Sequence, residues 1–379
     1  MNVSHPYRVI HIVENLNKGA VENWLVRMLC HAHHQGEDCD WTFYCSLGQP
    51  GALDELVRSV GGKIVYSPVS LNSRQVFFRA LRTELQHGNY EVMHCHHDLM
   101  NAVYLLASIG LPIRKRIVHI HNADENLPTP SLLKQRLLRE PMRRICLRAD
   151  RVVGISQHTL DTFLAGRQRR SSRDLVHYYG VDPTPFVLTN PDRLKFRQDL
   201  GLAPDALILL FGGRITLEKN PVMVVDVLAA LIRIEPRSVA VFAGAGSLGE
   251  EVRKRSHLLG VENSIRMIGW RHDLPKVMSC CDWFILPRPE QPMEGFGLAV
   301  VEAQLAGLRL LLSTGIPDDP LLSTACYRRL SLSQGADEWA RAAVELLNEH
   351  PTAVSAIAAL HTSAMDMDDA LQNLLKLHT

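Results

Sequence analysis

Short runs of apolar and β-branched residues recur along the whole chain, with longer amphipathic segments between them. Runs of this length bounded by turn-forming residues are typical of buried strands, and the longer segments are typical of helices. Strands that alternate with helices form βαβ units and therefore parallel sheets. The expected strands lie at 8–13, 39–47, 62–68, 91–96, 116–122, 150–156, 175–180, 206–214, 238–246, 264–270, 282–287, 308–313 and 327–333.

A chain of 379 residues is long for one hydrophobic core and sufficient for two. The segment 180–193 contains three prolines between two series of expected strands, which indicates a linker. We therefore expect two doubly wound, Rossmann-like domains, 1–183 and 184–364. The amphipathic segment 365–379 is expected to return to the first domain. Ligands of such sheets bind outside the carboxyl ends of the strands, which predicts a shared central cleft.

The net charge of +1 hides a difference between the two halves. Residues 1–180 contain 22 Lys and Arg against 16 Asp and Glu, a balance of +6, and the remainder has a balance of −5. Basic residues interleaved with leucines at 134–148 favour an anionic membrane surface as partner, and a solvated face is the alternative. We do not expect nucleic acid as a partner.

The chain has neither a run of 18 apolar residues nor the pattern of a signal peptide at its beginning. We expect a cytoplasmic protein that can lie on the inner face of a membrane as a peripheral protein. The eight cysteines are scattered and lack C-x-x-C spacing, so free thiols are expected rather than disulfides or a zinc site.

The segment 287–307, PRPEQPMEGFGLAVVEAQLAG, combines a proline-rich loop with a buried helix. Three prolines exclude a helix at its start, whereas 298–306 has the composition of one. Gly295 and Gly297 lie at the junction, where backbone N–H groups without shielding side chains can bind an anion such as phosphate.

Two glutamates flank that junction. Glu294 precedes the glycines and Glu302 follows about one helical turn later. Because carboxylates repel phosphate, we interpret them as partners of hydroxyl groups on either side of it. A phosphate between two polyols describes a nucleotide sugar, and a glycine-rich loop with two solvated glutamates is the alternative.

The segment FGGRITLEKN at 211–220 follows an expected strand of the same domain. Arg214 offers a planar fork of donors and Lys219 a mobile point charge, a pair suited to a diphosphate that gains negative charge as it leaves. Ordinary surface charges are the alternative interpretation.

A third motif, FAGAGSLG, places Gly244, Gly246 and Gly249 in G-x-G-x-x-G spacing. The dinucleotide fingerprint follows the first strand of its fold, whereas this motif follows the second strand of its domain. We therefore favour a tight turn near a ligand over a nicotinamide or flavin site.

These segments together resemble the retaining glycosyltransferases of family 4, which have the two-domain GT-B fold. The Glu294-to-Glu302 spacing around Gly-Phe-Gly carries the resemblance, as do GRITLEKNP, FAGAGSLGEEV and STGIPD. More loosely, LNKGAVENWLVRML, EVMHCHHD and RIVHIHNADE are similar to the first domain of that family.

The resemblance implies a role for each matching residue. In the second domain, Arg214 and Lys219 would bind the donor diphosphate and Glu302 the ribose. Glu294, with the amides of Gly295, Phe296 and Gly297, would bind the sugar. In the first domain, His121 would lie at the reaction centre, and Gly19 would allow the first loop to approach the donor or acceptor closely. The family commonly has two glycines in that first loop, whereas here Lys18 precedes Gly19. The resemblance therefore does not define the path of this loop.

Paired histidines suggest a metal site in the first domain as an alternative to a metal-independent site. Alternation along a strand places His94 with His96, and His119 with His121, on one face. The resemblance instead predicts an enzyme without metal or other cofactor, in which Arg and Lys replace the divalent ion.

The expected function is transfer of a hexosyl or N-acetylhexosaminyl group, with retention, from a UDP-linked donor to a polysaccharide or lipid-linked acceptor in surface glycan biosynthesis. Without an evident nucleophile, retention points to same-face substitution. The alternatives are a sugar-nucleotide epimerase of the same architecture and an inactive sugar-nucleotide-binding subunit of an assembly complex.

Overall fold

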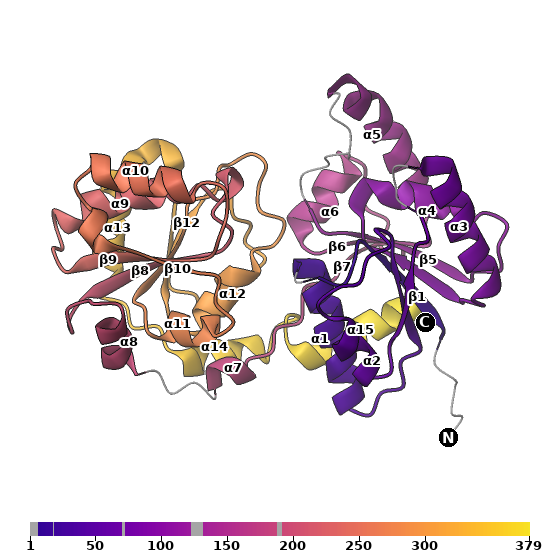
Figure 1. The fold of residues 1–379 in the computed structure, drawn as a ribbon, viewed down its shortest axis with the longest axis horizontal. Helices are drawn as coiled ribbons and strands as arrows, with labels where there is room; N and C mark the ends of the chain where they lie inside the picture. Colours follow the sequence, from indigo (N-terminus) through magenta and orange to yellow (C-terminus); the bar gives the residue numbers. More distant parts are fainter. Residues whose placement is uncertain (1–6, 18, 70–72, 123–131, 188–191) are drawn as a thin grey trace. The chain divides into compact units, whose positions relative to one another are not determined.

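The computed structural model describes residues 7–17, 19–69, 73–122, 132–187 and 192–379, and divides the chain into two compact units (Figure 1). The first unit contains residues 1–180 with 367–379, and the second contains 181–366. The chain thus enters and leaves the second unit at neighbouring points. There the N–H of Val181 donates to the carbonyl of Met365 at 2.9 Å, and Val181 pairs with Asp366 in a parallel bridge.

The first unit is built on a parallel sheet with the strand order β3-β2-β1-β4-β5-β6-β7 among the described residues. Its strands are β1 (Val9–Val13), β2 (Trp41–Cys45), β3 (Lys63–Tyr66), β4 (Val92–Cys95), β5 (Lys115–Ile120), β6 (Arg151–Gly154) and β7 (Asp174–Val176). Its helices are α1 (Ala20–His34), α2 (Asp54–Ser59), α3 (Arg74–His87), η1 (Asp98–Met100), α4 (Asn101–Ala107), α5 (Leu132–Cys146), α6 (Gln157–Leu164) and α15 (Met367–His378).

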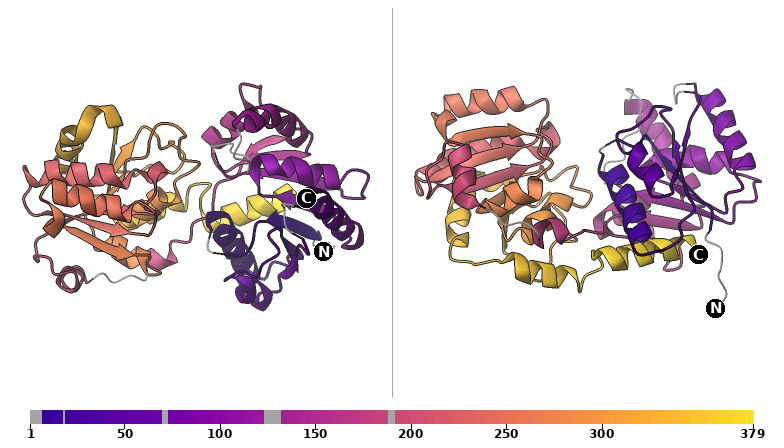
Figure 2. Two further views of the ribbon diagram at one scale, coloured as in Figure 1. Left: turned by 45° about the horizontal axis from the view of Figure 1, so that its top comes forward. Right: turned by 60° about the horizontal axis from the view of Figure 1, so that its bottom comes forward.

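The two faces of this sheet differ in chemistry. Alternate strand residues such as Ile10, Met93 and Val118 join an apolar core with residues of α3, α4 and α6. The residues between them are histidines, which lie on the opposite face together with Trp24 of α1 and His378 of α15. Helix α15 packs against α1 (Figure 2), and its His378 lies against the ring of His11, so the C-terminal helix covers part of the histidine face.

The second unit repeats the plan with a parallel sheet of order β10-β9-β8-β11-β12-β13 among its described residues. Its strands are β8 (Leu207–Gly212), β9 (Ser238–Ala243), β10 (Ile265–Gly269), β11 (Trp283–Leu286), β12 (Arg309–Ser313) and β13 (Tyr327–Leu330). Its helices are α7 (Thr184–Val187), α8 (Arg193–Asp199), η2 (Leu217–Lys219), α9 (Pro221–Ile232), α10 (Gly249–Leu258), η3 (Glu262–Ser264), α11 (Leu274–Ser279), α12 (Leu298–Leu305), η4 (Leu332–Gln334), α13 (Gly335–Leu346) and α14 (Ala353–Leu360).

Helices cover both faces of the second sheet as well. Helix α9 packs on β8 and β9 and contacts α10 and α13, while α12 packs on β12 and contacts α14 (Figure 1). Each expected strand segment overlaps a strand of the structure, although β7 covers only the first two residues of the expected strand at 175–180. The prediction of two doubly wound parallel sheets is confirmed. Within the described part of the chain, no helix is both long and apolar enough to span a bilayer.

The glycine motif after β9 serves backbone packing. The N–H groups of Gly213 and Ile215, in the loop after β8, donate to the carbonyls of Ala243 and Ala245 at 3.0 Å. A Cβ on Gly246 would lie 2.3 Å from the carbonyl oxygen of Ile215, so only glycine allows the two loops to approach this closely. The spacing that resembles a dinucleotide fingerprint is accounted for by a contact inside the protein.

This packing generates a matched pair of substitutions. Gly246→Ala should lower the free energy of unfolding by about 1–3 kcal/mol, because the added methyl group overlaps the backbone of Ile215. Gly249→Ala is the control, since its Cβ would meet no atom within 4 Å and it lies at the first residue of α10. Urea denaturation of both variants measures the difference, and equal stability would contradict the packing role of Gly246.

Candidate functional site

The order of strands in the second sheet brings two loops together. Strand β8 lies between β9 and β11, so the connections leave in opposite directions from the neighbouring strands β8 and β11. Such a switch point opens a crevice at the carboxyl ends of the two strands, where ligands of doubly wound sheets bind. The loop after β8 contains Arg214 and Lys219, and the loop after β11 contains Glu294.

A side-chain hydrogen bond ties the two loops to each other. The amide Nδ2 of Asn220 donates to the carbonyl of Pro287 at 3.0 Å, directly beyond the end of β11. Asn220 has φ 50°, a left-handed conformation that asparagine tolerates better than most residues, and Pro221 then begins α9. The turn that carries Lys219 is therefore anchored on the loop that carries Glu294.

Lys219 and Glu294 form an ion pair at this edge of the sheet, with Nζ 2.5 Å from Oε2. A second cation, Arg288, donates from its NH1 to the same carboxylate oxygen at 3.1 Å. Burial alone raises the pKa of Glu294, but the charges of Lys219 and Arg288 outweigh burial and hold it below the usual range. Glu294 is thus an ionised carboxylate shared by two cations.

Arg214 acts on this group through its charge, which also lowers the pKa of Glu294. Its side chain is 71% exposed and pairs with Glu218, four residues later in the chain, at 3.2 Å. Exposed pairs of this kind contribute little to stability, so the guanidinium is available to another anion.

Arg288 escaped the sequence analysis because nothing in its local pattern distinguishes it from a surface arginine. Its side chain is only 10% exposed, and its Nε and NH2 donate to the carbonyls of Pro292 and Met293 at 3.1 and 3.3 Å. The guanidinium therefore holds the loop after β11 as well as Glu294. Only the folded loop shows this role.

The segment after β12 supports the same loop from the other side. The N–H of Glu294 donates to the carbonyl of Gly315 at 2.8 Å, and the hydroxyl of Thr314 donates to Glu290 at 2.7 Å. Gly315 packs so closely that a Cβ would lie 2.2 Å from the carbonyl oxygen of Pro289. The STGIPD motif thus positions the loop that carries Glu294.

Helix α12 begins directly after the Gly-Phe-Gly sequence. Gly297 has φ 95°, a left-handed conformation that glycine adopts without strain, and it precedes the first helical residue, Leu298. Phe296 is buried, and Glu302 lies about one turn into the helix at a half-buried position. The first N–H groups of a helix lack intrahelical partners, and the expected anion site at this end of α12 rests on that property.

In the first unit, Gly19 is exposed and precedes the first residue of α1. Its carbonyl accepts from the N–H and the side-chain Nδ2 of Asn23 at 3.0 and 2.9 Å, which fixes the beginning of the helix. Lys18, on which the open question about the loop rests, lies outside the described residues.

His121 occupies a buried position at the end of β5. Its N–H donates to Asp98 at 2.7 Å, so Asp98, a residue the sequence analysis did not single out, fixes the backbone there. Its Nδ1 bonds the hydroxyl of Tyr179 at 2.8 Å and its Nε2 bonds Nδ1 of His96 at 3.0 Å. Both ring nitrogens are therefore engaged within the first unit.

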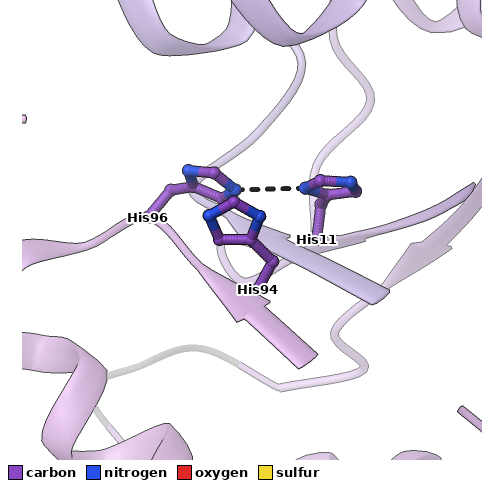
Figure 3. Close-up of side chains that lie close together, drawn as sticks. All are labelled: His11, His94 and His96. Carbon is purple, nitrogen blue, oxygen red and sulfur yellow. Dashed lines mark hydrogen bonds between the residues drawn. The ribbon is translucent and has the colours of Figure 1, made fainter. Parts of the chain in front are cut away.

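His121 belongs to a larger layer of buried histidines on one face of the first sheet. We call it the histidine layer, and it consists of His11, His94, His96, His119, His121, His177 and His378. His96 also bonds His11 at 3.1 Å (Figure 3). His94 bonds both His119 and His378 at 3.1 Å. The expected common face of His94 with His96 and of His119 with His121 is confirmed by their stacked rings.

Two triads within the layer have metal-ligand spacing among the described residues. Nitrogens of His11, His94 and His96, and of His96, His119 and His121, lie within 4.8 Å of one another. These nitrogens largely bond other imidazoles, and neither triad includes a carboxylate or thiolate from the described chain. The nitrogens of these triads are used mainly for hydrogen bonds between rings, whereas Nε2 of His11 and Nε2 of His119 are buried without a hydrogen-bond partner among the described residues.

Comparison with protein families identifies related sequences for both units. Residues 21–185 match the family model described as Glycosyltransferase Family 4, and residues 192–358 match Glycosyl transferases group 1. The chain is 26% identical to the putative glycosyltransferase EpsF of Bacillus subtilis, over 98% of this chain and 97% of that protein. It is 30% identical to a D-inositol 3-phosphate glycosyltransferase of Actinosynnema mirum, over 62% of this chain and 60% of that one.

Solved structures share the fold over nearly the full length. HepE of Anabaena, crystallised with UDP, superposes with a TM-score of 0.76 and 19% identity over 97% of this chain and 98% of its own. A glycosyltransferase of Rickettsia africae superposes with a TM-score of 0.78 and 16% identity, over 99% and 98%. The expected GT-B fold is thereby confirmed.

The histidine layer predicts sensitivity to acid. Burial lowers the pKa of its members, to about 3 for His121 and His378, from an ordinary value near 6.5. Below pH 6.5 the unfolded chain binds more protons than the folded chain, so stability falls as pH falls. Each histidine that stays neutral should remove on the order of 1 kcal/mol between pH 7 and pH 5.5.

Urea denaturation at a series of pH values measures this loss. His119→Gln should reduce the slope of stability against pH, because it removes a buried imidazole whose pKa is lowered by burial. A free energy of unfolding that does not change between pH 7 and pH 5.5 would contradict neutral burial of the layer.

Proposed function

We propose that this chain, which belongs to glycosyltransferase family 4 and has the GT-B fold, transfers a hexosyl or N-acetylhexosaminyl group. The donor is UDP-linked and the transfer proceeds with retention of configuration. Family membership supports a glycosyltransferase of glycan biosynthesis. The donor, the acceptor and the stereochemistry are the proposed part. HepE, a structural neighbour, is seen with UDP and with UDP-glucose, which is why UDP is chosen here.

The observation that carries the proposal is the ion pair between Lys219 and Glu294 at the switch point of the second sheet. A lysine held in a crevice by a carboxylate is a preformed cation that an incoming diphosphate can recruit. Arg214, exposed on the same loop, supplies a second cation with a planar fork of donors. Together they would neutralise the charge that develops on the leaving diphosphate.

The beginning of α12 would complete the donor site. The amides of Gly295, Phe296 and Gly297 lie where the loop becomes a helix, next to Glu294. We assign these amides and Glu294 to the sugar and adjoining phosphate. Glu302, one turn further along, is assigned to the ribose hydroxyls, as the family resemblance implies.

The reaction is proposed to proceed by same-face substitution, in which the leaving diphosphate helps to deprotonate the acceptor hydroxyl. The protein then contributes positioning and stabilisation of charge, and no divalent ion is required. His121 is assigned to the reaction centre on the resemblance. Since both of its ring nitrogens are engaged, a ring contact with sugar requires exchange of its bond to Tyr179 or His96.

The acceptor is proposed to be a polysaccharide or lipid-linked saccharide presented at a membrane. Helix α5 supports this part, because Leu133 and Leu137 are 67% and 65% exposed on a helix that also carries Lys134 and Arg144. Exposed leucines beside basic residues suit the interface of an anionic membrane.

The relatives named above are transferases, which favours a transferase function over a sugar-nucleotide epimerase or an inactive binding subunit.

The diphosphate clamp is tested by removing each cation. Arg214→Ala and Lys219→Ala should each lower turnover by roughly 10² to 10³, the usual loss when one preorganised donor to a developing anion is removed. UDP release by transfer of the sugar to water is measured with UDP-glucose, UDP-galactose and UDP-N-acetylglucosamine in excess EDTA, where the wild type should stay active. Arg233→Ala, exposed elsewhere on the second unit, is the control. Near-normal turnover in both variants would disprove the clamp.

The two glutamates should separate in their effects. Glu302→Gln weakens charge-assisted bonds to ribose, so the binding free energy of UDP should fall by roughly 1 to 3 kcal/mol. Glu294→Gln should leave UDP affinity undiminished, because it removes a carboxylate that competes for Lys219, and should depress turnover. Calorimetry with UDP beside kinetics measures both. An equal loss of UDP affinity in the two variants would show that Glu294 does not lie at the sugar.

A further inference from the structure

We propose that Arg288 is a positioning residue that keeps Glu294 ionised and in place when Lys219 turns from Glu294 to the donor diphosphate. This inference rests on the proposed function, because it requires a diphosphate at Lys219. It adds a residue that neither the sequence motifs nor the family resemblance assigned.

The starting point is competition for one cation. In the structure Lys219 and Arg288 both bond Oε2 of Glu294, and the side chains of Lys219 and Glu294 are each only 16% exposed. A diphosphate carries more negative charge than one carboxylate, and lysine is a mobile point charge on a flexible stem. Donor binding therefore draws Lys219 away from Glu294.

Without a second cation, that exchange would leave Glu294 as a buried, unpaired carboxylate. Such a group takes up a proton or rotates toward solvent, because burial disfavours the charged form. Either event would remove the carboxylate from the sugar at the time it is needed. Arg288 prevents both by staying at 3.1 Å from Oε2.

Arg288 is suited to remain because the loop itself holds it. Its Nε and NH2 donate to the carbonyls of Pro292 and Met293, the two residues before Glu294, while NH1 faces the carboxylate. The guanidinium is planar, so these three contacts fix its orientation. With its donors directed at the loop and at Glu294, Arg288 acts through Glu294 and not as a ligand of the diphosphate.

The test compares Arg288→Met and Arg288→Lys in the full chain. Binding is measured with UDP. Turnover is measured with whichever of the three UDP-sugars gives the fastest UDP release with the wild type. We expect Arg288→Met to change the Kd of UDP by less than about threefold and to lower turnover by about tenfold or more. The acid limb of its kcat-against-pH profile should move up by about one pH unit, since the carboxylate loses the cation bonded to it and keeps only the weaker influence of Arg214. Arg288→Lys should return the limb toward wild type.

Two controls make the outcome specific. Glu294→Gln should remove the acid limb, which assigns that limb to Glu294. Arg255→Met, which removes an arginine paired with Asp226 on another face of the same unit, should change neither the limb nor turnover. If Arg288→Met unfolds, Arg288→Gln and Arg288→Lys carry the same comparison between a neutral and a charged side chain.

Each result decides the matter. An acid limb that stays in place without the Arg288 charge overturns this inference while leaving the proposed function intact. A loss of UDP affinity greater than tenfold also overturns it, because Arg288 would then be a diphosphate ligand. Absence of UDP binding by the wild type would instead overturn the proposed function and this inference together.

Discussion

Pairing of β8 with β11 is the constraint on which the candidate site depends. Leu209 pairs with Trp283 and Leu210 with Phe284, so two strands more than 70 residues apart become neighbours. Their following loops then leave the same edge of the sheet, and the bond from Asn220 to Pro287 joins them. Without this pairing, the loops that carry Lys219 and Glu294 would not lie next to each other.

The charge arrangement at that edge has a consequence for the resting protein. A carboxylate between two cations leaves one net positive charge in the group of Lys219, Arg288 and Glu294. The carboxylate keeps Lys219 oriented before any anion arrives, and lowers the cost of holding two cations close together. The site is thus prepared for an anion without accumulating an unbalanced cluster of cations.

The first unit buries a layer of histidines on one face of its sheet. Strands β1, β4 and β5 place neutral imidazoles where a doubly wound sheet usually has aliphatic side chains, and hydrogen bonds between rings offset much of the cost of burying their nitrogens. The bond between His94 and His378 also joins β4 to the C-terminal helix. The layer therefore helps to return the end of the chain to the unit where it began.

The sequence by itself determined the strands, the two doubly wound sheets and the candidate residues Arg214, Lys219, Glu294 and Glu302, because apolar periodicity and the choice of glycine or proline report local burial and local backbone. Only the tertiary structure decided that Glu294 is shared with Arg288, that Gly246 faces Ile215, and that His121 is bonded on both sides. These are contacts between side chains or loops brought together by strand order. Local pattern carries no information about which distant residue will occupy the other side of a contact.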